Sequence, residues 1–270
     1  MRLRKLLLVN NNCYKSGVHM KPQGVMVHST GANNPWLKRY VGPDDGFLGQ
    51  NQYNNHWNMG GLNVCVHAFI GKLADGTIAT YQTLPWDMRG WHCASGPYGS
   101  GNNTHISFEI CEDGLADPAY FAKVYTEAVE LTAHLCCLYE LDPLADGVVI
   151  CHSEGHDRGI ASNHGDVEHW FPKHGKTMDD FRADVASAMG KEIEQDMDQA
   201  KFKALFLEMR KELQDNDASE YSREAREWAV STGLVQGGSG EEFNGMWEDL
   251  LTREQMATLL YRFAKMVGVV

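Results

Sequence analysis

Side chains that can bind a metal ion gather in one stretch of this sequence, residues 150–172. Its metal-binding types are four of the chain's 12 histidines and two aspartates: His152, His156, His164, His169, Asp157 and Asp166. Imidazole nitrogens and carboxylate oxygens are common zinc ligands. Glycines and small polar residues interrupt the stretch and predict a loop. Because the loop follows the apolar run 148–150, we expect a metal site at a strand end, and a polar surface loop with incidental histidines is the alternative.

His28 also lies at the end of an apolar run, 24–27, far earlier in the chain. Two imidazoles on neighbouring strands and one carboxylate make a tetrahedral zinc site whose fourth position stays open for water. We therefore predict that Zn²⁺ is bound by His28, His152 and Asp166. A single histidine at a strand end is more often structural, so the prediction depends on the three groups together.

A third strand-like segment, 105–111, carries a candidate proton acceptor, Glu109. Alternation separates Glu109 from the apolar side chains of this strand. Zinc acidifies a bound water and polarises a carbonyl, and a neighbouring carboxylate can take the water's proton. An imidazole near the developing oxyanion would help, and either His164 or His156 is available for this role. The alternative is that Glu109 only pairs with a Lys or an Arg.

The elements that would position these groups alternate between strands and helices. The expected strands are 24–28, 64–70, 77–84, 105–111 and 148–151. A tight turn makes the second and third of these a hairpin. Helices are expected at 118–140 and from Thr177, and residues 31–63 are expected to form a long loop with a helical turn near 36–40. This order predicts an α/β domain over residues 1–190, with a mixed central β-sheet flanked by helices.

The composition changes after Gly190, where the chain becomes highly charged. Residues 191–215 predict an amphipathic linking helix from apolar side chains near helical spacing: Ile193, Met197, Phe202, Leu205, Phe206, Met209 and Leu213. A second helix is expected at 220–232, with three buried residues: Ala225, Trp228 and Ala229. Thr252 and Gln255 form a capping-box pattern that opens a third helix. Residues 191–270 are thus expected to form a small all-helical C-terminal module, too small to be stable as a lone monomer.

Composition also limits the classes of function and the compartment. The formal net charge of -12 argues against a nucleic-acid binder that depends on a basic groove. No apolar run reaches the roughly 18 residues of a membrane span. The basic start precedes only four apolar positions, 6–9, too few for a signal peptide, so we expect synthesis in the cytoplasm without general secretory export. Seven cysteines, an odd number mostly within apolar runs, are expected to be buried thiols rather than disulfides.

Five short motifs occur in order over roughly residues 20–185. They are Val-Met-Val-His-Ser-Thr-Gly (25–31), Val-His-Ala-Phe-Ile (66–70), Gly-Trp-His-Cys (90–93), Ile-Ser-Phe-Glu-Ile-Cys (106–111) and Cys-His-Ser-Glu-Gly (151–155). Together they resemble the zinc-dependent N-acetylmuramoyl-L-alanine amidases (amidase type 2), a type shared by peptidoglycan-recognition proteins and phage endolysins. The resemblance implies a mixed sheet with helices on its faces, and hydrolysis of the amide between N-acetylmuramic acid and L-alanine in peptidoglycan. By position, it makes His28 and His152 zinc ligands and Glu109 the catalytic acid/base.

The third ligand lies where the chain departs from the family pattern. The family usually continues with Lys-x-Cys or Lys-x-Asp and then Pro-Gly, whereas this chain has His164-Gly-Asp166-Val after a longer stretch. We match Asp166 to the third ligand and His164 to the lysine that contacts the transition state. His156 and His169 are competing candidates for the third ligand.

The motif at 90–93 supplies candidate substrate contacts. The resemblance places His92 in the cleft, and we expect Trp91 and His67 to contact the substrate with it. From the residues alone, His92 and His67 flank aromatic residues and can equally be hydrogen-bonded core imidazoles.

The C-terminal segment resembles a surface-layer-homology repeat, through motifs at 228–237, 251–256 and 260–263. Such modules usually occur in threes and bind cell-wall polymers, but only one copy is visible in this chain. The resemblance implies binding of a secondary cell-wall polymer, or a homo-oligomer formed through residues 191–270 that multiplies weak sites by avidity. A helical appendage that only stabilises the protein is the alternative.

These patterns together favour an endolysin-like peptidoglycan amidase that stays in the host bacterial cytoplasm until it is released to the cell wall. The alternatives are a recognition protein that binds peptidoglycan without cleaving it, and a zinc peptidase of the stem peptide. A non-catalytic member is expected to lack a zinc ligand or the base, whereas all four predicted groups are present in this chain.

Overall fold

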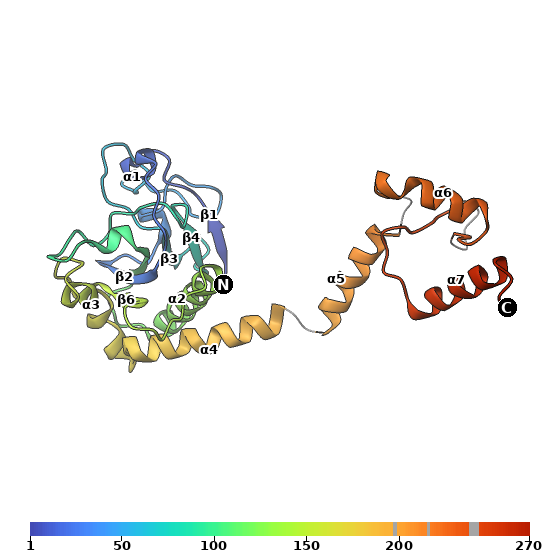
Figure 1. The fold of residues 1–270 in the computed structure, drawn as a ribbon. Helices are drawn as coiled ribbons and strands as arrows, with labels where there is room; N and C mark the ends of the chain where they lie inside the picture. The colour runs from blue at the N-terminus through green and yellow to red at the C-terminus, as the bar shows by residue number, and fades with distance from the viewer. Residues whose placement is uncertain (197–198, 215–216, 238–242) are drawn as a thin grey trace. The chain divides into compact units, whose positions relative to one another are not determined.

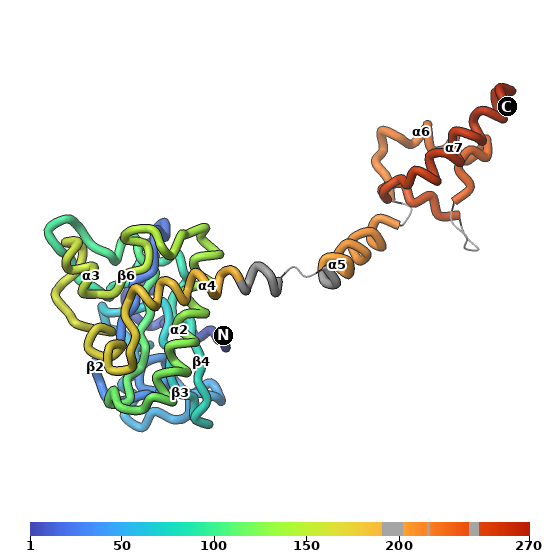
Figure 2. Tube along the Cα trace, turned by 90° about the horizontal axis from the view of Figure 1, so that it is seen from below, coloured from blue at the N-terminus to red at the C-terminus, as the bar shows by residue number. Residues whose placement is uncertain are grey.

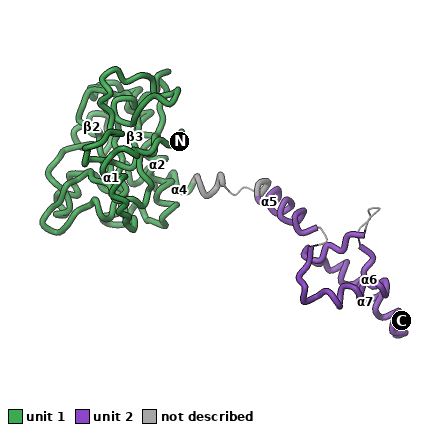
Figure 3. Tube along the Cα trace, turned by 90° about the horizontal axis from the view of Figure 1, so that it is seen from above, with its two compact units in different colours: residues 1–192 green, residues 193–270 purple. Residues whose placement is uncertain are grey.

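The computed structural model describes residues 1–196, 199–214, 217–237 and 243–270, with side chains described outside 191–201. The chain forms two compact units, Met1–Glu192 and Ile193–Val270, which Figure 3 colours separately. The first unit contains every residue that was predicted to do chemistry.

Unit 1 is built on a six-stranded sheet (Figure 1). Its strands, in spatial order, are β1 (Leu3–Lys5), β4 (Ile78–Gln82), β3 (Ala68–Lys72), β5 (His105–Glu112), β2 (Gly24–Asn33) and β6 (Val149–Cys151). Strands β3 and β4 pair antiparallel as the predicted hairpin, whereas the other neighbouring pairs are parallel. The mixed sheet predicted from the sequence is therefore confirmed.

Helices α2 (Pro118–Leu138) and α4 (Met178–Asp196) pack against one face of this sheet. The Asp117 carboxylate accepts hydrogen bonds from backbone N–H groups of the first turn of α2, which fixes where this helix begins. The rings of Tyr125 and Phe181 meet with their centroids 5.6 Å apart, and the two helices lie side by side in Figure 2. Apolar side chains from β2, β3, β5 and β6 complete the core beneath them.

The other face of the central strands carries the polar side chains of the site. On β5, Phe108 and Ile110 point into the helix-covered core, so Glu109 between them points to the opposite face. The parallel register then sets Glu109 directly beside His28 of β2. The alternation expected for this strand is therefore confirmed, and it brings two predicted site residues together.

Strand β2 is longer than predicted. We expected it to end at His28, but it continues to Asn33, with an irregular register after Ser29. The polar residues beyond His28 stay in the strand because Asn33 still pairs with Glu112 at the end of β5. His28 therefore lies within a strand that is paired on both sides, not at its end.

Residues 152–157, predicted as loop, form helix α3 (His152–Asp157). The Glu154 carboxylate accepts the Cys151 N–H at 3.0 Å, and Arg182 of α4 binds the same carboxylate at 3.0 Å. Gly155 allows a close approach, since a Cβ atom there would lie 3.0 Å from a methionine of the sheet. The loop prediction was wrong here because these tertiary contacts outweigh the local composition. Two short 3-10 helices follow, η3 (Asp166–His169) and η4 (Phe171–His174).

Cys13 and Cys65 form a disulfide, contrary to the prediction that the cysteines are thiols. Cys13 lies on α1 (Asn12–Ser16), Cys65 precedes β3, and their Cα atoms are 6.4 Å apart, within the range of disulfides. The number of cysteines does not reveal which of them meet in the fold, and these two are 52 residues apart in sequence. The expectation of buried thiols is confirmed for Cys93, Cys111, Cys136 and Cys151, but it is wrong for Cys137, which is exposed near the end of α2.

Unit 2 is helical in its described parts, as predicted. Its helices are α5 (Gln199–Glu212), η5 (Glu220–Ser222), α6 (Arg223–Ser231) and α7 (Arg253–Met266). Thr252 and Gln255 make the predicted capping box at the start of α7. Ala229 is buried, but Ala225 and Trp228 are exposed, because the helices of this small unit leave most of their side chains at the surface.

The predicted linking helix 191–215 corresponds to the end of α4 and to α5. The expected apolar positions Ile193 and Met197 lie outside the described side chains. Within unit 2, Arg210 of α5 pairs with Asp249 at 2.7 Å. None of the helices in the described ranges is both long and apolar enough to cross a membrane.

Candidate metal centre and active site

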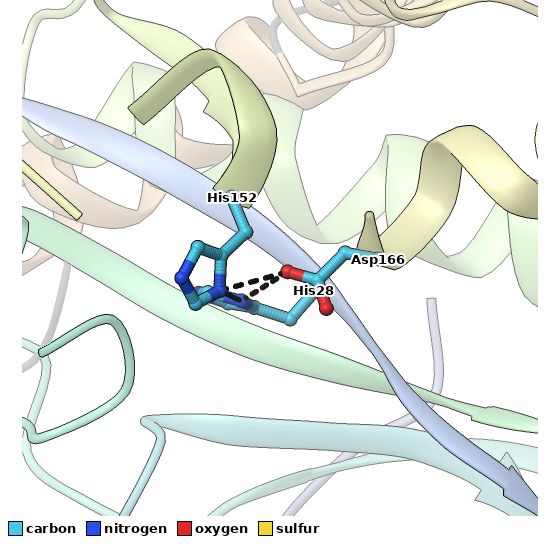
Figure 4. A group of neighbouring side chains, drawn as sticks. All are labelled: His28, His152 and Asp166. Atoms are coloured by element: carbon cyan, nitrogen blue, oxygen red, sulfur yellow. Dashed lines mark hydrogen bonds and ion pairs between the residues drawn. The ribbon is translucent and has the colours of Figure 1, made fainter. Parts of the chain in front are cut away.

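Three predicted ligands from separate parts of the chain converge beside the sheet (Figure 4). His28 comes from β2, His152 from the first turn of α3, and Asp166 from the start of η3. The Oδ2 atom of Asp166 lies 2.9 Å from His28 Nδ1 and 3.0 Å from His152 Nδ1. The two Nδ1 atoms are 3.2 Å apart. One donor atom of each residue thus faces a common point, with all three atoms within 4.8 Å of one another.

The protonation states of His28 and Asp166 suit a divalent cation. Burial lowers the pKa of His28, although Asp166 opposes the shift, so the imidazole is neutral and keeps a lone pair for a metal. Burial alone would raise the pKa of Asp166, but its close contacts with the imidazoles of His152 and His28 hold that pKa well below the usual value. Two imidazoles and one carboxylate are the donor set of an open zinc site. The residues present therefore fit a zinc ion.

Each imidazole of the triad is also held through its second ring nitrogen. His28 Nε2 is 2.9 Å from His92 Nδ1, and His152 Nε2 is 3.2 Å from the hydroxyl of Ser162. Metal-binding histidines are commonly oriented by such a bond. Ser162 was missed in the sequence, where a serine among other small polar residues gives no signal of this role.

His92 contacts a ligand of the triad, whereas it was predicted to contact the substrate. Its backbone N–H donates to Asn102 Oδ1 at 2.7 Å, which turns the ring toward His28. Burial and the neighbouring histidines lower the pKa of His92 well below its usual value. A neutral ring can accept the hydrogen bond of His28 at Nδ1, so its position supports the ligand.

Glu109 has a shielded carboxylate oxygen that takes part in no ion pair among the described residues. Its Oε2 atom is shielded from solvent and has no hydrogen-bond partner among the described residues. Burial, followed by the nearby charges of Asp166 and Glu112, raises the pKa of Glu109 well above its usual value. The alternative of a pairing Lys or Arg finds no such partner in the described part of the chain.

His67 is a core residue, and the prediction that it contacts substrate was wrong. Its side chain is fully buried, with Nε2 2.6 Å from the carbonyl oxygen of Met88 and Nδ1 accepting the N–H of Ser107 at 3.0 Å. Both ring nitrogens are satisfied inside the protein, and no surface is left for a substrate. The alternative interpretation of a hydrogen-bonded core imidazole is the one the structure supports.

Trp91 is 38% exposed and is available for contact with a large substrate. The Arg89 guanidinium lies over its ring, 5.3 Å from the centroid. Trp91 borders a hollow of about 300 Å³ that it shares with Arg89 and Asn63. The role of Trp91 in substrate binding stays a prediction.

The surplus histidines of the His-rich stretch take different positions. His164 is exposed, with its ring centroid 4.9 Å from that of His152, so it borders the metal centre. His156 Nδ1 lies 3.4 Å from the carbonyl oxygen of Ala161, and His169 Nε2 bonds Glu112 at 2.9 Å. Neither joins the triad, so Asp166 remains the predicted third ligand.

Comparison with known proteins agrees with this geometry. Residues 18–169, more than half of the chain, match the family of N-acetylmuramoyl-L-alanine amidases. The chain belongs to this family.

Individual relatives are more distant. A segment of 37 residues is 49% identical to the N-acetylmuramoyl-L-alanine amidase CwlH of Bacillus subtilis, covering 14% of this chain and 15% of that protein. The solved structure of PlyL superimposes with a TM-score of 0.50 at 21% identity, covering 68% of this chain and 97% of PlyL, and shows a shared fold. The Staphylococcus aureus hydrolase AmiA, solved in complex with its ligand, has a TM-score of 0.48 at 20% identity, over 70% of this chain and 82% of AmiA.

Proposed function

We propose that this protein hydrolyses the amide between N-acetylmuramic acid and L-alanine in peptidoglycan, with Zn²⁺ held by His28, His152 and Asp166. The observation that carries the proposal is the triad itself, set beside an unpaired Glu109 in a chain of the amidase family. A bound zinc ion would activate water and polarise the scissile carbonyl.

The protein's own groups supply the proton transfers. Glu109 lies beside His28 in the parallel register of β2 and β5, on the face that carries the triad. Its raised pKa makes the carboxylate a stronger proton acceptor, so it can take a proton from the attacking water and return it to the leaving nitrogen. His164, exposed next to His152, is placed to donate a hydrogen bond to the developing oxyanion. His92 and Ser162 keep the imidazole ligands in orientation.

A recognition protein that only binds peptidoglycan is the less favoured function. Such a protein has no need of a carboxylate with a buried, unpaired oxygen beside a complete ligand set, and burying that oxygen costs folding free energy. Both are present in this chain. A zinc peptidase of the stem peptide would use the same groups, so the two hydrolases differ only in the bond that is cut.

Mass spectrometry of purified peptidoglycan after digestion distinguishes these functions. We expect stem peptides with a free L-alanine amino terminus and intact glycan strands, and no reaction after the metal is removed with a chelator. Added zinc should restore the reaction. Cleavage within the stem peptide would identify a peptidase, and absence of any product from the zinc-loaded protein would favour the recognition protein.

We further propose that unit 2 binds a secondary cell-wall polymer and assembles chains into a homo-oligomer. The resemblance of this unit to a surface-layer-homology repeat supports the first part. So does a hollow of about 500 Å³ whose lining includes Trp247, Glu254 and Arg262, a mixture of aromatic and charged groups that suits a carbohydrate. For the second part, α5 exposes Phe202 (57%), Leu205 (50%) and other apolar side chains at helical spacing.

Two measurements on the full chain test these roles separately. Trp247→Ala should weaken cosedimentation with purified cell walls and leave cleavage of soluble fragments unchanged. Light scattering should show a mass above one chain that falls in the variant Phe202→Glu, with Lys211→Gln on the same helix as a control. A monomeric wild type would contradict the assembly, and unchanged wall binding by Trp247→Ala would contradict the polymer site.

A further inference from the structure

Asp166 has a backbone conformation that most residues avoid. Its φ angle is +37°, in the left-handed region where a side chain other than that of glycine is strained. Such a residue persists only when its surroundings hold it there. The preceding residue, Gly165, has ordinary right-handed backbone angles, so the left-handed conformation falls on Asp166 and not on the glycine. Something else must therefore hold the short helix η3, which begins at Asp166.

A hydrogen bond three residues further on supplies one restraint. His169, at the last position of η3, bonds Glu112 Oε1 through Nε2 at 2.9 Å. Glu112 is a buried side chain, 4% exposed, at the end of β5. Its Oε1 atom also accepts the N–H of Gly31 at 3.1 Å, and its own N–H donates to the Thr30 hydroxyl at 3.1 Å. Contacts with β2 and β5 therefore fix this carboxylate independently of His169.

The rest of η3 is anchored mainly on its inner side. Val167 and the following Trp170 are fully buried in the core under α2. On the outer side, the exposed Glu168 accepts a hydrogen bond from the half-buried Ser153 of α3. The contact of His169 with Glu112 thus joins η3 to the strands that carry His28 and Glu109.

We propose that Glu112 and His169 form a clamp that positions Asp166 as the third metal ligand. The clamp rests on the proposed metal site and gives His169 a role other than that of a ligand. It links the end of β5, which carries the catalytic carboxylate, to the turn that carries the ligand. Loosening it should let the strained backbone of Asp166 relax and carry its carboxylate away from His28 and His152.

Zinc affinity of the full-length protein, measured by competition with a chromophoric chelator, tests the clamp. His169→Leu should lower the affinity about tenfold or more, the range seen when groups that orient metal ligands are removed. His169→Gln should recover most of the wild-type affinity, because its amide can still donate to Glu112. Glu168→Gln, on the same turn, is the matched control and should bind zinc like the wild type. Thermal unfolding of the metal-free variants separates loss of zinc from loss of the fold.

The possible results show whether the clamp proposal, the metal-site proposal or both are contradicted. A wild-type protein that binds no zinc would contradict both. A wild type that binds zinc while His169→Leu binds it equally well would contradict the clamp alone, and so would equal losses in His169→Leu and His169→Gln. If His169→Leu does not fold, Glu112→Gln serves instead. It keeps the shape of the side chain and should lower zinc affinity in the same direction, by a smaller factor.

Discussion

A single carboxylate oxygen, Oε2 of Glu109, carries much of the proposed chemistry. It is buried without a hydrogen-bond partner among the described residues, next to the metal triad. Leaving a buried polar atom unsatisfied costs stability. In the proposed mechanism this oxygen is the proton acceptor, and its lone pairs are not shared with another group of the described residues.

Glu109→Gln should therefore preserve the fold and zinc content and lose nearly all lytic activity. The amide keeps the size of the side chain but cannot accept the proton, and general-base catalysis contributes roughly 10²- to 10⁴-fold. Turnover on purified peptidoglycan, together with metal analysis of the same preparation, checks this. Full lysis by the variant would remove Glu109 from the proposed mechanism.

Asp166→Ala and His164→Ala should lower activity in different ways, the first through loss of bound zinc and the second through a lower kcat. Asp166 contacts both imidazoles of the triad, so its loss should reduce bound zinc. His164 borders the triad without belonging to it, so its loss should lower kcat and leave zinc content intact. Metal content and steady-state rates of the two purified variants decide, and the reverse pattern would exchange their roles.

Most of the metal site could be predicted from residue types, but the groups around it could not. His28, His152 and Asp166 were identified because ligands of zinc belong to a few residue types. His92 and His67 look alike in sequence, each beside apolar or aromatic neighbours. Only the fold reveals that one ring reaches His28 and that the other is bonded within the core. Hydrogen-bond partners distant in sequence leave no local pattern.

Among the elements, α3 matters most because it begins at a metal ligand. His152 occupies its first position, directly after β6. The Glu154 carboxylate joins the helix N-terminus to Arg182 of α4. The orientation of His152 therefore depends on a contact that lies outside the metal centre.

Glu154→Ala should destabilise the protein by roughly 1–2 kcal/mol, because it removes a helix cap and a partly buried ion pair. It should also weaken zinc binding through His152. Asp157→Ala, exposed at the other end of the same helix, is the control and should change neither property. Chemical denaturation and zinc titration of both variants provide the measurements. Identical zinc affinity in the wild type and Glu154→Ala would show that α3 is held by other contacts.

Strands were more predictable than the short helices of unit 1. On β5, apolar and polar residues alternate, and the apolar face packs into the core under α2, so the pattern follows directly from the fold. Helix α3 has a cysteine at its cap position and a glycine in its middle, neither of which favours a helix. Its capping glutamate, its ion pair with α4 and its close packing on the sheet all come from tertiary structure.

At the scale of the whole molecule, several buried histidines make folding depend on pH. Burial lowers the pKa of His67 to about 4, and it also lowers the pKa of His28, His92 and His105. An unfolded histidine takes up a proton near pH 6.5, whereas the folded protein resists it. The stabilisation is therefore complete above about pH 6.5 and is lost as the pH falls toward 4.

The metal-free protein should thus lose stability between pH 7 and 4.5, with His67 alone contributing on the order of 3 kcal/mol. Glu109 opposes this trend, because its raised pKa favours the folded state at lower pH. Measuring in the Glu109→Gln background removes that contribution. Thermal unfolding at a series of pH values checks the prediction, and a midpoint that does not change over this window would contradict it.

Because Cys13 and Cys65 form a disulfide, the stability of this protein depends on whether its surroundings are oxidising or reducing. Closing a loop of this length contributes about 4 kcal/mol in the chain-entropy description. Cys65 also exchanges backbone hydrogen bonds of 3.0 and 3.1 Å with Trp91, the neighbour of His92. Samples kept under a reducing agent and samples kept in air would therefore differ in stability. The affected cysteine, Cys65, is bonded to Trp91, and the next residue, His92, contacts the ligand His28. Zinc affinities and unfolding midpoints of variants are comparable only when this bond is in the same state in all of them.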